Sequence, residues 1–171
     1  MTPSVRRIGP EDAEAYRAIR LAALDGDPAS FSSDLATERA HPLAWYADGA
    51  AENSIFLAFD GATPVGMAGL AGSEREKTSH IGVVFGVYVV PSCRRKGVAA
   101  RLMQTVIAHA QPTLLQLHLE VAVDNIAALA LYHRLGFAAY GTEPRALRIK
   151  ERFIDEHLMV RFLDEEEIQN D

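Results

Sequence analysis

The spacing of hydrophobic positions changes along the chain between the period of a helix and the period of a strand. Residues 5–8 are predicted to form a short strand, and residues 10–26 a helix, because proline and two acids stand in its first turn. The apolar face of this helix is expected to consist of Ala15, Ala18, Ile19, Ala22 and Ala23. A second helix is predicted over residues 34–48, with Pro42 interrupting it.

The middle of the chain has the composition of strands. Residues 54–70 are predicted to form a hairpin around an Asp-Gly turn. Residues 81–90 are apolar on both faces and contain Gly82 and Gly86, which predicts a buried, bulged central strand.

The last third returns to alternating elements. In chain order, we expect a helix at 98–110, a strand at 114–123, a helix from Asp124 or Asn125 to about Leu135, and strands at 137–140 and 153–162. A strand–helix–strand unit of this length implies that its two strands are parallel. The order β-α-α-β-β-β-α-β-α-β-β predicts an α/β (α+β) fold with a mixed central sheet and helices on both faces. Residues 1–163 are expected to form one domain, followed by an acidic tail at 164–171.

Composition narrows the class of protein. A chain with 49% hydrophobic and 23% charged residues is typical of a globular domain. No apolar run approaches the roughly 18 residues of a membrane span, and the net charge of −6 argues against broad nucleic-acid binding. The single cysteine excludes an internal disulfide and favours the cytoplasm, while the six histidines lack metal-ligand spacing.

One stretch joins a strand, a basic turn and a helix. The turn carries Arg94, Arg95 and Lys96, and Gly97 and Ala99 keep the start of the helix open to a ligand. The first N–H groups of a helix lack partners and its dipole is positive there, so such a turn binds phosphate readily. The ordinary alternative is a surface loop whose cations are solvated.

A second stretch follows about thirty residues later, where Asn125 succeeds a strand and Tyr132 lies two helical turns further on. Together with the motif V-P-x-x-R-R-x-G-x-A at residues 90–99, this arrangement resembles the GNAT superfamily of acyl-CoA-dependent N-acetyltransferases. The element order fits the same family over nearly the whole chain. Two departures are an arginine at the first position of the turn, where glutamine is common, and Ala99 in place of glycine.

The resemblance implies a transferase that uses acetyl-CoA as co-substrate and acetylates an amine of a small molecule, protein or peptide by direct attack on the thioester. Residues 94–99 would hold the pyrophosphate, and Val89 would donate to the oxyanion. Asn125 would contact the CoA arm. The full set of cofactor-binding residues implied is Tyr88, Val89, Arg94, Arg95, Lys96, Gly97, Val98, Ala99, Asn125 and Tyr132.

Two residues are candidates for proton transfer. The resemblance implies that Tyr132 protonates the departing thiolate. Glu120, on the polar face of its strand, is the first candidate for the base that deprotonates the amine, and His80 is the second. Each position also has an ordinary explanation, since Asn125 could be only a helix cap, Tyr132 an amphipathic helix residue and Glu120 a solvated strand residue.

Two other functions and the acceptor stay open at this point. The chain could be a non-catalytic acyl-CoA-binding sensor or partner module, or a nucleotide-binding protein that uses the same turn. Residues 25–34 and 143–151 are expected to select the acceptor, but Arg145, Arg148 and Lys150 favour an anionic group while the overall charge favours a cation. Homodimers are frequent in folds of this kind, which leaves a homodimer as an option.

Overall fold

The computed structural model describes residues 3–164. Its helices and strands are β1 (Ser4–Arg7), α1 (Ala13–Gly26), α2 (Leu35–Ala40), α3 (Leu43–Glu52), β2 (Ser54–Asp60), β3 (Thr63–Ala71), β4 (Ile81–Val89), α4 (Val98–Ala110), β5 (Gln116–Ala122), α5 (Ile126–Arg134), β6 (Ala138–Ile149) and β7 (Arg152–Phe162). Short 3-10 turns lie at η1 (Pro10–Asp12), η2 (Pro28–Ser30), η3 (Glu76–Thr78) and η4 (Pro91–Cys93). This content confirms the predicted fold class.

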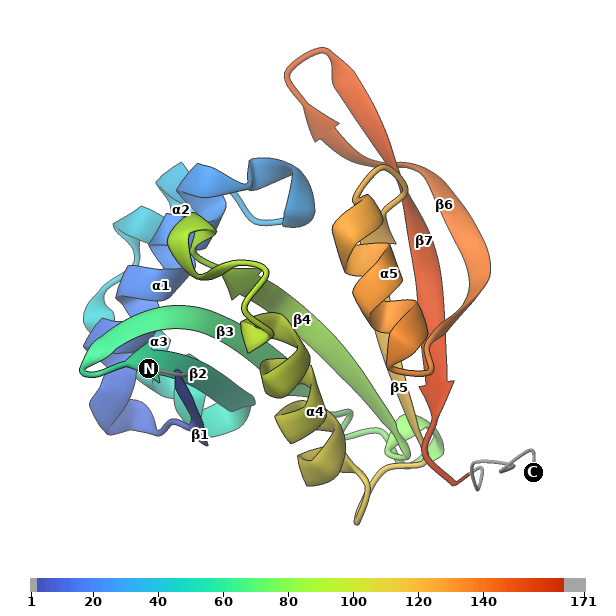
Figure 1. Cartoon of the computed structure of the whole chain (residues 1–171), viewed down its shortest axis with the longest axis horizontal. Helices are drawn as coiled ribbons and strands as arrows, with labels where there is room; N and C mark the ends of the chain where they lie inside the picture. Colours follow the sequence, from blue (N-terminus) through green and yellow to red (C-terminus); the bar gives the residue numbers. More distant parts are fainter. Residues whose placement is uncertain (1–2, 165–171) are drawn as a thin grey trace.

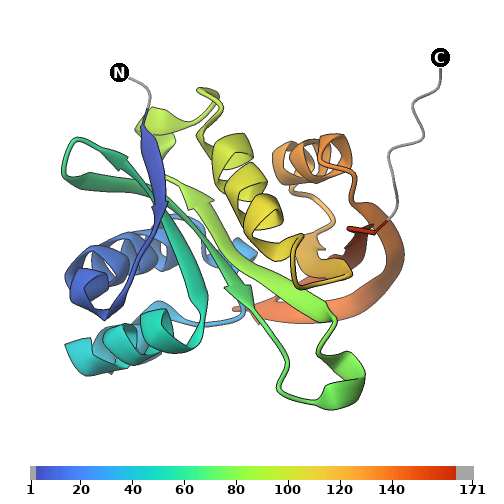
Figure 2. The same ribbon diagram turned by 90° about the horizontal axis from the view of Figure 1, so that it is seen from below.

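All seven strands of the described chain belong to one sheet, in the order β1-β2-β3-β4-β5-β7-β6. The pair β4–β5 is parallel, as the predicted crossover requires, and the other neighbouring pairs are antiparallel. Helices α1 and α3 cover one face of the sheet, and α4 and α5 cover the other (Figures 1 and 2). Two apolar cores result, one under α4 and one under α1 and α3.

The helical region near the N-terminus differs from the prediction in two ways. The predicted helix at 34–48 is two helices, because the backbone of His41 and Pro42 is extended and ends α2 before α3 begins. The buried face of α1 is also rotated relative to the predicted one and consists of Ala13, Tyr16, Ile19, Arg20, Ala23 and Leu24. Ala18 and Ala22 are exposed, since the larger side chains take the core positions.

The strand β6 is longer than predicted. It continues past Tyr140 to Ile149, so most of the segment at 143–151, expected between two strands, belongs to β6. Two register shifts along β6 accommodate residues that strands disfavour, including Pro144, and β6 is an edge strand where proline is tolerated. Tertiary pairing thus overrides weak local strand preference.

Two further predictions concern the acidic tail and a membrane span. The predicted acidic tail at 164–171 lies outside the described residues except for Asp164. From residue 3 to residue 164, no helix combines the length and the apolar character needed to cross a membrane.

Candidate active site

A gap opens in the middle of the sheet between β4 and β5. The two strands pair only over Ile81–Val83 and Gln116–His118, and beyond these residues they separate toward the carboxyl end of β4 (Figure 1). Gly86 lies in this unpaired part of β4 with φ +64°, and the register of β4 against β3 shifts nearby. The predicted bulge is therefore present, and it bends β4 where the gap begins.

The basic turn follows β4 at the wide end of the gap. Arg95 and Gly97 have φ values of +59° and +76°, and Gly97 is the N-cap of α4. A left-handed arginine costs roughly 1 kcal/mol or more and is typical of functional sites. Within the described residues, no protein acceptor receives the backbone N–H groups of residues 95–100. The turn thus presents consecutive free donors beside exposed cationic side chains.

Arg94 is placed differently from the other cations of the turn. Its Nε donates to the carbonyl of Val89 at 2.8 Å, and its guanidinium lies 5.6 Å from the Tyr88 ring centroid. Its own backbone N–H donates to Pro91. The run of free N–H groups predicted at 94–99 therefore begins at Arg95. The side chain of Arg94 instead holds the turn at the end of β4 through its hydrogen bond to Val89.

The end of β4 directs one backbone donor toward the gap. The N–H of Val90 donates to the carbonyl of Val65 on β3 at 2.9 Å. Because successive backbone groups of a strand point to opposite sides, the N–H of Val89 points away from β3 and toward the gap. This is the orientation that the predicted oxyanion role of Val89 requires. The Tyr88 side chain is buried under α1, with its hydroxyl beside Gly26.

The helix α5 carries the next two predicted residues along the other side of the gap. The Oδ1 of Asn125 accepts from the N–H of Ala128 at 3.2 Å, which confirms the N-cap and leaves the amide NH₂ without a partner among residues 3–164. Tyr132 packs edge-on against Phe137, and burial raises the pKa of its hydroxyl far above the usual value. Every fully enclosed side-chain oxygen in the described chain has a partner, whereas this hydroxyl has none, so its oxygen keeps an opening to solvent.

The two candidate bases lie at different positions along β4 and β5. Glu120 is exposed and stands just past His118, where β5 leaves β4. His80 precedes β4, and its carbonyl accepts from the N–H of Gln116 at the closed end. At about 3.3 Å per residue, the nine residue steps from His80 to Val89 span roughly 30 Å. This distance disfavours His80 as the base, and Glu120 stays the candidate.

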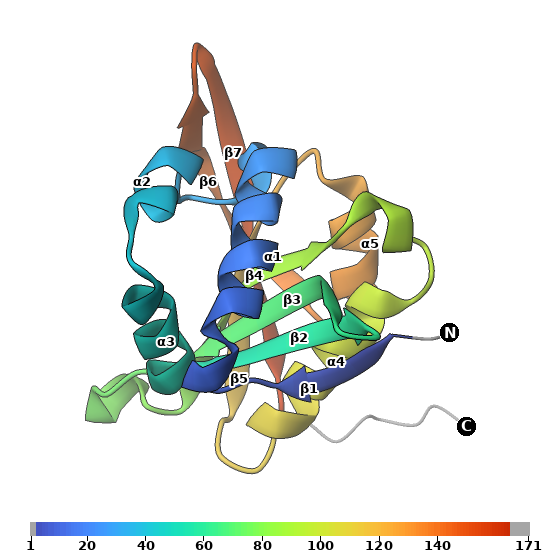
Figure 3. The same cartoon turned by 90° about the vertical axis from the view of Figure 1, so that its left-hand side faces the viewer.

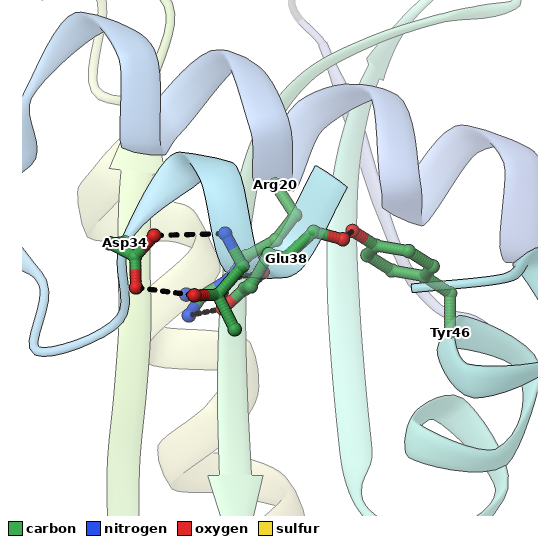
Figure 4. A network of polar contacts seen from close by, with 5 residues as sticks. Arg20, Asp34, Glu38 and Tyr46 are labelled. Atoms are coloured by element: carbon green, nitrogen blue, oxygen red, sulfur yellow. Dashed lines mark hydrogen bonds and ion pairs between the residues drawn. The ribbon is translucent and has the colours of Figure 1, made fainter. Parts of the chain in front are cut away.

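A buried ion pair fixes the segment between α1 and α2 next to the gap (Figure 4). Arg20 makes a forked contact with Glu38, with Nη2 to Oε1 at 2.6 Å, and the Tyr46 hydroxyl donates to the Glu38 carbonyl. Asp34 caps the helix through the N–H of Thr37. Arg20 also reaches Gly86, where a Cβ would lie 3.3 Å from its Nη1, so the pair joins the helices to the bulge of β4.

The sequence reasoning missed one carboxylate. Glu156 lies on β7 between Ile154 and Leu158, on the face of the strand that otherwise carries apolar side chains, and it is only 7% exposed. Burial, followed by the charges of Glu120 and Glu143, raises its pKa. The signal that could have identified it is a single carboxylate within the apolar face of an alternating strand.

Known proteins resemble this chain in sequence. A model of the acetyltransferase (GNAT) family matches residues 18–137. The chain is 32% identical over 136 residues to mycothiol acetyltransferase of Gordonia bronchialis, a match that covers 78% of this chain and 42% of that one. It is 31% identical over 122 residues to the N-alpha-acetyltransferase RimI of Mycobacterium tuberculosis, covering 71% and 67%. The chain therefore spans less than half of the first relative and about two thirds of the second.

A solved structure resembles it in fold. The protein yncA of Salmonella typhimurium, solved with its cofactor acetyl-CoA, has a TM-score of 0.79 and 21% identity, covering 97% of this chain and 96% of that one. The sequence matches and this shared fold agree with the arrangement of the gap, the basic turn and α5. The chain belongs to the acetyltransferase (GNAT) family.

Proposed function

We propose that the chain is an N-acetyltransferase that transfers the acetyl group of acetyl-CoA to an amine of a small molecule or a protein. The observation that carries the proposal is the run of N–H groups at residues 95–100, which have no acceptor among residues 3–164 and lie at the wide end of the gap. The names of the two relatives and the cofactor of yncA support the same chemistry.

The basic turn is suited to the pyrophosphate of CoA. The free N–H groups and the positive end of α4 offer donors to phosphate oxygens, and Arg95 and Lys96 add charge. Between the separated strands, an extended pantetheine arm would lie beside the end of β4 in the manner of an added strand. The N–H of Val89 would then donate to the thioester carbonyl and stabilise the oxyanion that forms there.

Proton transfer requires an acid for sulfur and a base for nitrogen. As the amine nitrogen bonds to the carbonyl carbon, the C–S bond breaks and the sulfur needs a proton. Tyr132 can supply it, because a tyrosine hydroxyl is protonated at neutral pH. An alkylammonium has a pKa near 10.4, so Glu120, directly or through water, would remove its proton before attack.

Titration with acetyl-CoA, followed by a thiol-release assay on a panel of amines, tests this proposal. We expect micromolar binding of acetyl-CoA, weaker binding of ATP, and CoA release with at least one amine. Binding without release on any amine would favour a non-catalytic acyl-CoA sensor. ATP binding as tight as that of acetyl-CoA would favour a nucleotide-binding protein and overturn the proposal.

Two finer predictions continue from the sequence. A cytoplasmic location follows from the single cysteine, and a homodimer follows only from analogy with similar folds. Fractionation and light scattering would test them.

A further inference from the structure

Three carboxylates share one face of the sheet beside the gap. Glu143 on β6 is directly opposite Glu156 on β7, and Glu120 on β5 is opposite Leu158, two residues further along. Cross-strand neighbours have Cβ atoms about 5 Å apart, and diagonal neighbours about 7–8 Å apart. Glu156 is therefore close to both of the other carboxylates.

This face is the one turned toward α1 and α2. Successive side chains of β7 alternate, and Met159 and Arg161 point to the α4 and α5 side, where Arg161 donates to the carbonyl of Leu135. Glu156 and Leu158 both have the other parity, so their side chains lie on the opposite face of β7 from Met159 and Arg161. Figure 3 views the sheet from the side of α1, α2 and α3. The turn η2, between α1 and α2, contacts β5 and β6, the strands on either side of β7, so it lies over this part of the face.

The three carboxylates have no cation to balance them. Among residues 3–164, no lysine, arginine or histidine pairs with Glu120, Glu143 or Glu156, and no group donates a hydrogen bond to them. Like charges directly opposite on adjacent strands destabilise a sheet, and burial adds to the cost. The oxygens of Glu156 nonetheless keep an opening to solvent, since no fully enclosed side-chain oxygen of the described chain lacks a partner.

The neighbouring groups also favour a cation. Tyr140 lies beside His118 with ring centroids 5.5 Å apart and is 56% exposed, which leaves an aromatic ring at the border of the carboxylates. The hairpin arginines do not compensate the charge, because Arg145 and Arg148 lie over Phe153 on the opposite face of β7. No cluster in the described chain has the arrangement of a metal site. An organic cation fits this surface.

We propose that Glu143 and Glu156 bind a second positively charged group of the acceptor, an ammonium or guanidinium, while its reacting amine lies near Glu120. The inference rests on the proposed function and names its substrate class as amines that carry a second cation about 7–8 Å from the first. Glu156 is the central residue, because it is more than nine-tenths buried, has no partner within residues 3–164, and is adjacent to both other carboxylates.

Calorimetry on the full chain saturated with CoA tests the subsite without turnover. The probes are 1,5-diaminopentane, n-pentylamine and 5-aminopentanoate, which differ only in the group at the far end. We expect the diamine to bind at least about tenfold more tightly than the monoamine, and the amino acid to bind most weakly. Glu156→Gln and Glu143→Gln should each remove most of the diamine preference, and the exposed Glu52→Gln on α3 should retain it.

Equal affinities of the diamine and the monoamine would overturn the inference, as would a diamine preference that survives in both Glu143→Gln and Glu156→Gln. Should Glu156→Gln fail to fold, the exposed Glu143→Gln decides the question. A titration with CoA, made before the amines are added, separates a failure of the proposed function from a failure of the second-cation subsite. Failure to bind CoA would overturn the proposed function, while the diamine preference would still be measured on the free chain.

Discussion

The basic turn after β4 and the carboxylate face of β5, β7 and β6 lie on either side of one gap but are built in different ways. The turn is a contiguous segment, residues 95–100, and it offers backbone N–H groups. The carboxylate face combines side chains from three strands with the covering turn η2, which lies some ninety residues or more earlier in the chain. A site made of backbone has a short motif, whereas a site made of distant side chains has none.

The two regions also differ in how much they lower the stability of the fold. The cations of the turn are exposed, and its strain is confined to the left-handed Arg95. The carboxylate face holds Glu156, unpaired among residues 3–164, and the neighbouring helices α1 and α2 hold the buried pair of Arg20 and Glu38. We therefore expect changes in the turn to affect acetyl-CoA binding alone, and changes in the other region to affect stability as well.

The largest expected effect comes from Arg95→Glu combined with Gly97→Asp. Two new negative charges at the pyrophosphate position should cost several kcal/mol of binding, or about a thousandfold or more in the Kd of acetyl-CoA. Calorimetry measures it, with Lys77→Glu on η3 as the matched charge reversal away from the turn. Unchanged binding by the double variant would remove the turn from the cofactor site.

The next largest effect is on stability and comes from the buried pair of Arg20 and Glu38, on α1 and α2. Glu38→Ala leaves Arg20 buried without a partner and should lower the free energy of unfolding by about 3–5 kcal/mol. Chemical denaturation measures this loss, and the Kd of acetyl-CoA should stay within about twofold. The double variant Arg20→Met with Glu38→Leu is the control, because an apolar pair of similar volume should recover most of the stability. A stable Glu38→Ala protein would contradict this role of the pair.

Substitution of Tyr132 on α5 should lower the rate of acetyl transfer without changing CoA affinity. Tyr132→Phe keeps the ring against Phe137 but removes the proton donor, so kcat should fall roughly tenfold to a thousandfold while CoA affinity is retained. Thiol release with an amine from the panel measures it. A kcat equal to that of the original chain would leave Tyr132 as a packing residue.

The smallest effect is a gain of stability in Glu156→Gln. Because its folded pKa is raised, the carboxyl contributes stability that is present below its unfolded pKa and lost as pH rises through the folded pKa. The variant lacks this loss, so its melting temperature should exceed that of the original chain at pH 7 and match it near pH 4. A lower melting temperature at pH 7 would show that Glu156 has a stabilising partner.

The same difference between the regions explains how far the sequence could predict the molecule. The turn, the crossover, the cap at Asn125 and the family followed from local patterns, because a strand, a helix start and a glycine each leave a local signal. The extent of β6 and the buried role of Glu156 depend on pairing with β7 and on covering by η2. Such contacts between distant segments leave no signal in any short stretch of sequence. The distance of His80 from Val89 likewise depends on how β4 pairs with β5.

The most direct test of the account is amide hydrogen exchange of residues 95–100 with and without saturating acetyl-CoA. These N–H groups have no acceptor in the described part of the chain, so we expect fast exchange in the free chain and strong protection when the phosphates accept from them. Amides of α3, on the opposite face, should exchange equally in both states. Unchanged exchange at 95–100 in a chain saturated with acetyl-CoA would contradict the central claim that this turn binds the cofactor.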